Sequence, residues 1–491
     1  MEHRRAPGAV SSRVENFPRH RRTASMCAKL FGILAVAAFC GTLAAELSAT
    51  DFAFVTTTDY SSGTGSVIWL DGSYATEKNV VDIHSDAVPR WYDGLIYVVN
   101  RLGGDNIQVL DPAANFETVR QFSVGNGSNP VDIVFVSPTK AYVSRNNSTE
   151  LWIVNPSTGA HTGTINLASF ADGDGLPEMD RMVITGGKLF ISIQRLDRNN
   201  WWLPVSPSWL AVVDVATDVL VDCDPGTPGT QGVLLTGTDP FSPIQLNPWT
   251  GRLYVSCVGW WGAADGKVEI VNPATLASEG YIFTETAAGG DINDVEILSA
   301  DKGYAIVTDA SFNQMLVSFN PSTGERIAKL YEPGAYVLND IELAPGRELF
   351  LCDQTTTNPG LRIWDTRTDT QITTHPIDVG LRPFEVCFSV PVQTAAETPA
   401  VAVLAQNYPN PFNPSTTIKY DMKEKGLVTL KIYNVAGRLV RTLVNGVMDA
   451  GTYSLAWDGR NNTGADVASG IYFYKMETKD FSQTKKMVML R

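Results

Sequence analysis

The chain has 491 residues, of which 44% are hydrophobic, and its formal net charge at pH 7 is −14. This length allows two or more domains with cores of ordinary size. The acidic balance argues against binding to nucleic acid or to anionic membranes, because both require basic patches.

Residues 1–45 are predicted to be a leader and signal peptide. The first 25 are polar and rich in Arg, and Lys29 precedes an apolar run that ends in small residues near Ala45. A short basic flank, an apolar core and a small-residue exit are typical of secretory signals, and Met26 is an alternative start. The run is short for a membrane span, so we predict no transmembrane segment in the mature chain.

A repeated unit fills residues 51–391. The stretch 129–167 reads as four short apolar-rich strands separated by turns such as Pro156–Gly159. Its second-strand segment recurs as FAFVTT (52–57), LIYVVN (95–100), AYVSR (141–145), LFISIQ (189–194), LYVSCV (253–258), YAIVTD (304–309) and LFLCD (349–353). A four-stranded unit cannot bury both of its faces alone, so seven copies predict an all-β, seven-bladed β-propeller.

The order of the segments predicts how the ring closes. The chain enters at a second strand, Phe52, and its last first-strand segment is 382–390. We therefore expect the final strand to complete the first blade, which leaves no open sheet edge between the two ends.

Four cysteines follow the predicted cleavage point, and no C-x-x-C motif occurs. They are Cys223, Cys257, Cys352 and Cys387. An exported protein permits disulfides, and four cysteines allow three pairings. Because these residues fall in or beside strands, we predict buried, unpaired thiols.

Loop length divides the two ends of the propeller. Turns between first and second strands, and between third and fourth strands, are short. Long insertions fall at the other end, at 168–176, 195–208, 222–241, 259–266 and 353–360. Function concentrates on loops that a rigid scaffold holds, so we predict the functional face at this long-loop end, around the mouth of the central channel.

An aromatic group on this face is the first candidate for ligand binding. It comprises Trp201, Trp202, Trp209, Trp260 and Trp261, with Arg195 and Arg198 nearby. Exposed tryptophans bind sugars, flat rings or cations by stacking and cation–π contacts. Alternatively, these side chains only hold their own long loops in place.

An acidic ring is the second candidate. Aligning the first strands on their leading Pro or Asp places five residues at one position, namely Asp132, Gln245, Glu296, Glu342 and Glu385, with Glu178 and Asp180 close to it. Such a ring around the upper channel would hold a cation or a polar ligand. In the alternative interpretation, the carboxylates bind neighbouring backbone N–H groups and hold the blades together.

The loop Asp172–Gly175 is a candidate calcium site. Asp172 and Asp174 alternate with glycines, and Glu178 and Asp180 follow. Ca²⁺ prefers several oxygen ligands on a bent backbone, although the spacing of an EF-hand is absent. A plain turn is the alternative, and no other cofactor is indicated.

Catalytic signatures are missing from the sequence. No G-x-S-x-G, HExxH or P-loop motif occurs, and the histidines are scattered singly. We therefore predict a binding protein rather than an enzyme. A lyase or glycan hydrolase that uses the channel-mouth carboxylates is one alternative, and an adhesive or structural surface protein is another.

The repeats also carry a resemblance to a known class. The segments LIYVVNRLGGDNIQVLDP (95–112) and AYVSRNNSTELWIVNPSTG (141–159) resemble the YVTN-type repeats of bacterial secreted propellers. The resemblance covers about residues 51–391. It implies the propeller fold and a surface or periplasmic binding protein, whose ligand would be an unknown small molecule, glycan or protein.

A linker and a second domain complete the chain. Residues 392–403 are rich in Pro, Ala and Thr, which is typical of a linker. Residues 404–491 alternate in strand fashion between Gly and Asn turns, and so predict a small immunoglobulin-like β-sandwich.

Three motifs of this second domain carry a resemblance of their own. NYPNPFNPSTTI (407–418), the WDG segment (457–459) and SGIYFY (469–474) resemble the C-terminal sorting domain of type IX secretion cargo and the immunoglobulin-like domain of flagellar hook-capping proteins. The resemblance implies export through an outer-membrane machine, to the medium or cell surface of a Gram-negative-type bacterium. An accessory sandwich without sorting activity is the alternative.

The same resemblance assigns roles to single residues. It implies an extended entry strand of Pro409, Asn410, Pro411, Phe412, Asn413 and Pro414, a turn of Trp457, Asp458, Gly459 and Gly464, and a basic tail with Lys485 and Lys486.

Overall fold

The computed structural model describes residues 51–389 and 403–490, apart from 248–249, 346–347, 405–406, 408–409, 415, 423–425, 449–450, 458 and 463–464. The predicted leader, and the predicted linker except its last residue, lie outside these residues, as do Pro409, Asp458 and Gly464. Within the described part, no helix is long and apolar enough to cross a membrane.

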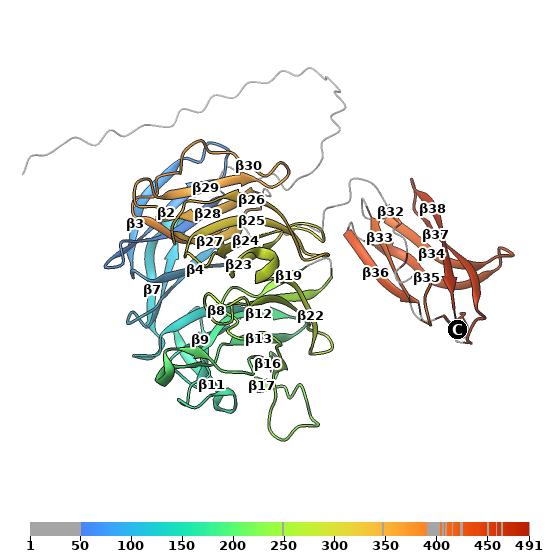
Figure 1. Cartoon of the computed structure of the whole chain (residues 1–491), viewed down its shortest axis with the longest axis horizontal. Coiled ribbons are helices and arrows are strands. Elements are labelled where there is room, and N and C mark those ends of the chain that lie inside the picture. Colours follow the sequence, from blue (N-terminus) through green and yellow to red (C-terminus); the bar gives the residue numbers. More distant parts are fainter. Residues whose placement is uncertain are drawn as a thin grey trace, which may run out of the picture. The chain divides into compact units, whose positions relative to one another are not determined.

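The strands between Phe52 and Phe388 form seven sheets of four or five strands and one small hairpin (Figure 1). The first sheet has the order β3 (Thr76–Ile83), β2 (Gly63–Trp69), β1 (Phe52–Thr58) and β31 (Arg382–Phe388). The second runs β4 (Ala87–Tyr92), β5 (Leu95–Asn100), β6 (Asn106–Asp111) and β7 (Glu117–Ser123), and the third runs β8 (Pro130–Ser137), β9 (Lys140–Arg145), β10 (Glu150–Asn155) and β11 (Ala160–Asn166).

The fourth sheet is the irregular one. It joins β12 (Met179–Thr185), β13 (Lys188–Ile193), β16 (Trp209–Asp214) and β17 (Val219–Leu220), with β18 (Val233–Leu234) paired to β16. Its long loop holds the hairpin β14 (Leu196–Asp197) and β15 (Leu203–Pro204) and the 3-10 turn Arg198–Asn200. Other short helical turns in the described part are Pro112–Ala114, Ala168–Phe170 and α1 (Glu285–Ala288).

Three regular sheets complete the propeller. The fifth has β19 (Gln245–Asn247), β20 (Arg252–Cys257), β21 (Lys267–Asn272) and β22 (Ala277–Thr284), and the sixth has β23 (Asp291–Ile297), β24 (Gly303–Thr308), β25 (Gln314–Asn320) and β26 (Glu325–Tyr331). The seventh has β27 (Leu338–Leu343), β28 (Glu348–Asp353), β29 (Gly360–Asp365) and β30 (Thr370–Gln371). These sheets confirm the predicted all-β propeller fold, and the described part of the chain has as many of them as the sequence has repeats.

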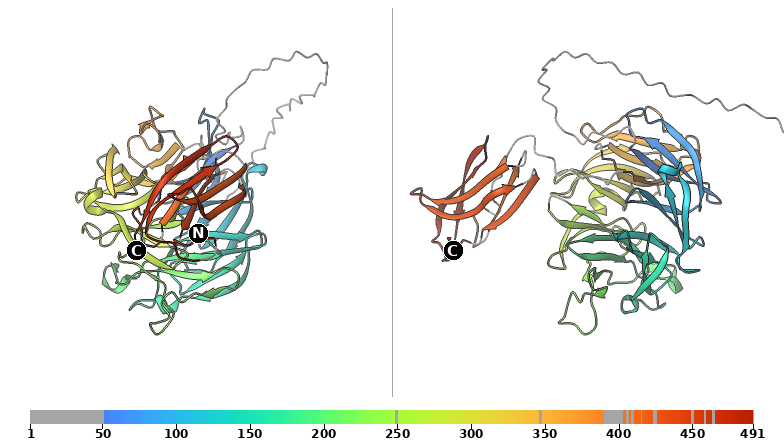
Figure 2. Two further views of the ribbon diagram at one scale, coloured as in Figure 1. Left: turned by 90° about the vertical axis from the view of Figure 1, so that its right-hand side faces the viewer. Right: turned by 180° about the vertical axis from the view of Figure 1, so that it is seen from behind.

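The ring closes as the strand order predicts. Strand β31, from the end of the propeller sequence, pairs antiparallel with β1, with Ala53 opposite Phe388 and Val55 opposite Val386. The first sheet and the sheet of β27–β30 are neighbours in Figures 1 and 2, and Val55 and Phe350 share one buried cluster. Closure by two distant segments ties the ends of the propeller together without leaving an unpaired inner strand.

The core lies between neighbouring sheets. Val99 of β5 and Val143 of β9 belong to one buried cluster, for example, and both are fully shielded from solvent. All four described cysteines are free thiols. Cys257 and Cys352 are buried as predicted, whereas Cys223 and Cys387 are only half-buried, so the prediction of full burial is wrong for those two.

The C-terminal domain is a sandwich of two sheets. One has the order β32 (Val403–Leu404), β33 (Thr416–Met422) and β36 (Gly451–Trp457), and the other β35 (Leu439–Met448), β34 (Gly426–Asn434), β37 (Gly470–Glu477) and β38 (Ser482–Met489). Lys485 and Lys486 lie on β38.

The motif residues of this domain have a packing role. Phe412 and Trp457 are buried in its core with ring centroids 5.6 Å apart. Gly459 has φ +70°, and a Cβ there would lie 2.4 Å from Met489 Cε and 3.0 Å from Pro414 O. The left-handed backbone and the close Pro414 carbonyl favour glycine here, so sterics account for that part of the motif.

Candidate functional site

The innermost strand of each propeller sheet faces a central channel that contains two cavities. These strands are β31, β4, β8, β12, β19, β23 and β27. The cavity at the long-loop end, here called the upper chamber, has a volume of about 210 Å³, and the lower one about 260 Å³. The lining of the upper chamber includes Arg101, Asp180, Arg181, Ser242, Pro243, Asn293, Asp294, Tyr336, Asp340, Phe384 and Glu385. Arg181 and Pro243 line both cavities and therefore form the partition between them.

Three carboxylates of the channel join one sheet to the next. Asp132 accepts hydrogen bonds from the backbone N–H of Met182 in the next inner strand (3.0 Å) and of its own neighbour Ile133 (2.9 Å). Asp294 accepts hydrogen bonds from the backbone N–H of Ile341 in the next inner strand (3.0 Å) and of its own neighbour Val295 (2.9 Å). Asp340 accepts from the N–H of Val386 (3.0 Å).

These bonds correct the predicted alignment of the acidic ring. Asp294 and Asp340, rather than Glu296 and Glu342, occupy the position that corresponds to Asp132. The alignment slipped by two residues, because residues two apart on a strand share the same face. Glu296 accepts instead from Gln245 Nε2 at 2.6 Å, and Glu342 lines the lower cavity. The role of holding blades together, offered above as the alternative, thus fits the carboxylates of Asp132, Asp294 and Asp340.

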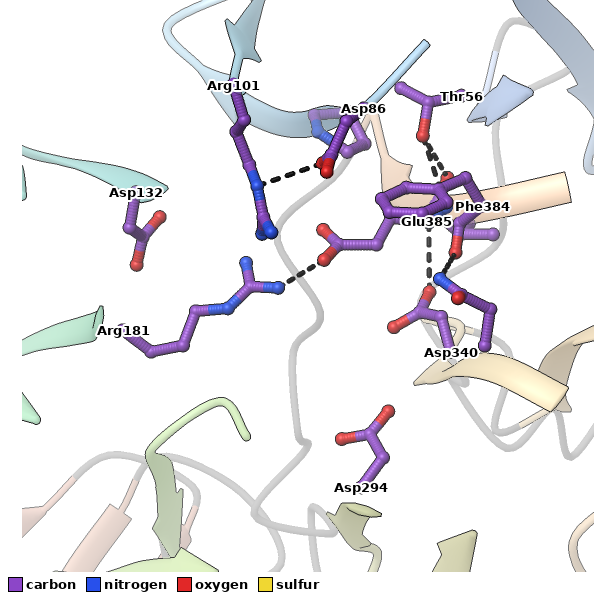
Figure 3. Close-up of polar contacts among 12 residues, drawn as sticks. Thr56, Asp86, Arg101, Asp132, Arg181, Asp294, Asp340, Phe384 and Glu385 are labelled. Carbon is purple, nitrogen blue, oxygen red and sulfur yellow. Dashed lines mark hydrogen bonds and ion pairs between the residues drawn. The ribbon is translucent and has the colours of Figure 1, made fainter. Parts of the chain in front are cut away.

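Arg181 lies at the centre of the channel and pairs with Glu385 (Figure 3). Glu385 Oε2 also lies 3.6 Å from Arg90 Nη1. Arg90 in turn donates a hydrogen bond from Nε to Asp132 Oδ1 at 2.8 Å. Burial opposes ionisation of Glu385, but Arg181 and Arg90 together hold its pKa below the ordinary value. Burial likewise opposes the charge on Arg181, while Glu385 and Asp180 hold the pKa of its guanidinium above the usual range.

Apart from Arg101 Nε, which lies 2.9 Å from Asp86 Oδ1 in an ion pair, four buried polar atoms on residues that line the upper chamber have no hydrogen-bond partner in the described chain. They are Asp180 Oδ2, Arg181 Nη1, Ser242 Oγ and Asn293 Nδ2. The four residues are between 3% and 9% exposed. Buried polar groups in folded proteins almost always have partners, so this group marks a place where a polar ligand or ordered water completes the network.

The fourth and fifth sheets have no aspartate at the position of Asp132, Asp294 and Asp340. In the fourth sheet this position is that of Arg181, which directly precedes Met182 as Asp340 directly precedes Ile341. In the sixth and seventh sheets, Asp294 and Asp340 stand two residues before Glu296 and Glu342. In the fifth sheet, Pro243 stands two residues before Gln245, and the inner strand β19 has only three residues. Burial raises the pKa of Asp180, the residue before Arg181, to about 7.

The aromatic candidates do not form one group. Trp201 is 86% exposed, and Trp202 lies under Arg198, whose guanidinium carbon is 4.8 Å from the ring centroid. Trp209 lies under Arg195, whose guanidinium carbon is 4.9 Å from the ring centroid, and its ring contacts Phe170. These contacts hold the loop in place, as the alternative interpretation expects.

The second pair of tryptophans lies on a different loop. Trp260 is 42% exposed. Trp261 packs between Phe241 and Tyr336, with ring centroids 6.1 Å and 6.3 Å apart. Phe241 and Tyr336 both line the upper chamber, so Trp261 supports its rim although no tryptophan is among the lining residues.

The predicted calcium loop brings three of its four acids together. Ligand atoms of Asp172, Asp174 and Glu178 lie within 4.8 Å of one another, whereas Asp180 lines the channel instead. The guanidinium of Arg198 reaches this cluster, with Nε 3.0 Å from Glu178 and 3.9 Å from Asp174. Burial raises the pKa of Glu178 to about 7. A protein cation therefore already lies at the place where calcium was expected.

Sequence reasoning missed Arg181, Arg90, Arg101, Ser242 and Asn293. The pairing of β12 with β13 is irregular between Met179 and Met182, and this bulge buries two neighbouring residues, Asp180 and Arg181, in the channel. Strict alternation would have turned one of them outward. The adjacent acid and base inside an apolar strand were the available signal.

Comparison with known proteins identifies one domain and the fold of the other. The model of the FlgD Ig-like domain matches residues 415–481, which confirms the immunoglobulin-like part of the resemblance. A search of the curated proteins gave no match to this sequence.

Solved structures resemble the chain in fold. A candidate 6-phosphogluconolactonase from Bacteroides uniformis is 14% identical with a TM-score of 0.51, over 69% of this chain and 99% of that protein. Another from Bacteroides fragilis is 12% identical with a TM-score of 0.50, over 70% and 99%. At such identities the similarity shows the propeller fold alone.

Proposed function

We propose that this chain is an exported binding protein. Its propeller accepts a small polar ligand in the upper chamber, and its C-terminal domain addresses it to an outer-membrane secretion machine. The observation that carries the binding role is the group of four unpartnered, buried polar atoms on residues that line one cavity. Evolved interiors rarely keep such atoms without a partner.

Binding is favoured over catalysis by the way the channel acids are used. Asp132, Asp294 and Asp340 accept backbone hydrogen bonds, and Glu385 pairs with Arg181. A glycan hydrolase needs two carboxyl groups placed on either side of a scissile bond. Acids committed to the scaffold are poor candidates for this task.

The export role is supported by both ends of the sequence. The basic flank and apolar run at 26–45 are typical of a secretory signal. The match to the FlgD Ig-like domain at 415–481 and the NYPNPFNPSTTI motif agree with the resemblance to sorting domains. We infer that the protein is released from, or held on, the outer cell surface.

The binding role is tested by a thermal-shift screen of residues 46–491. The panel contains neutral polyols, amino acids, organic acids and Ca²⁺. We expect at least one compound to raise the melting temperature of the wild type and to lose that effect in Ser242→Ala combined with Asn293→Leu. A screen in which every shift survives the double substitution would place binding elsewhere and reject the upper chamber.

The export role is tested separately with a reporter fusion. A signal peptide and a reporter enzyme, joined to residues 404–491, are produced in a bacterium that has a type IX secretion machine. We expect reporter activity outside the outer membrane, and retention in the periplasm when 404–491 is removed. Equal release of both forms would contradict a sorting role.

A further inference from the structure

We propose that the ligand of the upper chamber is a single neutral sugar ring. This inference rests on the proposed binding function and names its substrate class. It follows from the size, hydrogen-bonding capacity, charge and aromatic rim of the chamber, which are considered in turn.

The size of the chamber selects a small ligand that enters from one end. Its volume of about 210 Å³ is below the roughly 300–1,000 Å³ of sites for drug-sized molecules. Arg181 and Pro243, which line both cavities, form its floor, and the Arg181–Glu385 ion pair spans the channel there. A compact group the size of one sugar ring can therefore enter from the long-loop end and stop at this floor.

The hydrogen-bonding capacity of the chamber suits hydroxyl groups. Arg181 Nη1 and Asn293 Nδ2 can only donate, Asp180 Oδ2 accepts when ionised, and Ser242 Oγ does both. These atoms come from three consecutive sheets or their connections, so they line one side of the space. A hydroxyl donates and accepts at once, and a ring bearing several hydroxyls can satisfy several such donors and acceptors together.

The charge of the chamber disfavours ionic ligands. Its lining has four carboxyl groups, on Asp180, Asp294, Asp340 and Glu385, and two guanidinium groups, on Arg101 and Arg181. All of these residues except Asp180 are labelled in Figure 3. Arg181 pairs with Glu385, and Arg101 pairs with Asp86. Burial raises the pKa of Asp180 and Asp294 to about 7 and that of Asp340 well above its usual range. An ion of either sign would therefore enter a buried site that offers no free counter-charge. A neutral polar molecule avoids this penalty, because it brings no uncompensated charge into a buried site.

The rim of the chamber offers aromatic faces to the apolar side of a sugar ring. Phe241 and Tyr336 line the chamber and remain 43% and 55% exposed. Trp261 packs between them and fixes their spacing. Exposed aromatic rings above a polar floor fit a molecule with hydroxyl edges and C–H faces.

The experiment is isothermal titration of residues 46–491 with individual small compounds. The neutral probes are glucose, galactose, mannose and N-acetylglucosamine, the anionic probe is glucuronate, and the cationic probe is glucosamine. We expect at least one neutral sugar to bind and the charged analogue of the same ring to bind at least tenfold more weakly.

Matched variants assign the binding to the chamber. Ser242→Ala removes one hydroxyl and is expected to weaken binding about threefold to tenfold, the effect of one lost hydrogen bond. Ser318→Ala is the control, since Ser318 Oγ is also buried and unpartnered but is absent from the chamber lining. It is expected to leave the affinity unchanged.

The outcomes separate this inference from the proposed function. Binding of glucuronate or glucosamine in preference to every neutral sugar, with the same dependence on Ser242, would overturn the sugar assignment and leave the binding function standing. Neutral-sugar binding that Ser242→Ala and Ser318→Ala affect equally would overturn the placement in the chamber. Failure of all six probes to bind would overturn the sugar assignment, and the wider thermal-shift panel would then decide the binding function.

Discussion

Two acidic clusters of the propeller show how differently similar residues can be used. In the loop cluster, Asp172, Asp174 and Glu178 lie together, and the guanidinium of Arg198 pairs with Glu178 and Asp174. In the channel cluster, Arg181 pairs with Glu385, but its Nη1 atom has no hydrogen-bond partner among the described residues. Asp180 Oδ2 has no hydrogen-bond partner among them either. The number of acids is therefore a poor guide to a binding site. In the described chain, the loop cluster keeps one unpartnered buried atom, Asp172 Oδ2, whereas four such atoms lie on residues that line the upper chamber, so the concentration of unsatisfied polar atoms is a better guide.

The largest loss of unfolding free energy is expected from a substitution in the channel cluster. Arg181→Met leaves Glu385 buried beside other carboxyl groups, and removing one partner of a buried pair costs about 3–5 kcal/mol of unfolding free energy. Urea denaturation of the wild type and the variant measures this loss. The double variant Arg181→Met/Glu385→Gln is expected to recover most of it. A loss under about 1 kcal/mol in the single variant would show that the pair is not a structural element of the channel.

A smaller loss of unfolding free energy is expected from a substitution in the loop cluster. Arg198→Gln leaves Glu178 without its guanidinium and is expected to cost about 2 kcal/mol. The wild type should show no stabilisation by Ca²⁺, because Arg198 occupies the cluster, whereas the variant should gain a Ca²⁺-dependent rise in melting temperature. Chelator-reversible stabilisation of the wild type would instead restore the predicted calcium site.

The pH dependence of stability sharpens the comparison further. Burial raises the pKa of Asp180 to about 7 from 3.8, so between about pH 4 and pH 7 the folded chain holds a proton that the unfolded chain has lost. Stability should consequently fall as pH rises through this window, and Asp180→Asn should remove that part of the fall. Denaturation midpoints of the wild type and of Asp180→Asn at pH 5 and pH 8 give the change of stability with pH for each protein. An equal change in both proteins would contradict a neutral Asp180 in the folded state.

The smallest effect is expected at the exposed tryptophan. Trp201 is 86% exposed, so Trp201→Ala should change the unfolding free energy by less than about 0.5 kcal/mol. It should also leave sugar affinity unchanged, in contrast to Ser242→Ala. A loss of affinity as large as that of Ser242→Ala would return the ligand site to the loop tryptophans.

The fold could be predicted from the sequence because its signals are local and repeated. The strand segments from 52–57 to 349–353 recur, and the order of the first and last segments requires closure of the β31–β1 kind. The C-terminal sandwich could also be predicted from the sequence, because the conformation of Gly459 and the burial of Trp457 constrain which residues its motif can contain.

The site could be predicted only in part, for physical reasons. Alternation along a strand repeats every two residues, so alignment alone could not separate Asp294 from Glu296. The inward position of both Asp180 and Arg181 depends on a bulge, which a regular period does not reveal. The rim joins Phe241, Trp261 and Tyr336 from three separate segments, and only the folded chain brings them together.

The most direct test of the binding role is a high-resolution crystal structure of the propeller with the tightest neutral sugar from the titrations. The account predicts ligand density in the upper chamber, with hydroxyl groups within hydrogen-bond distance of Asp180 Oδ2, Arg181 Nη1, Ser242 Oγ and Asn293 Nδ2. A chamber that contains only ordered water at saturating sugar, with density elsewhere on the surface, would contradict it.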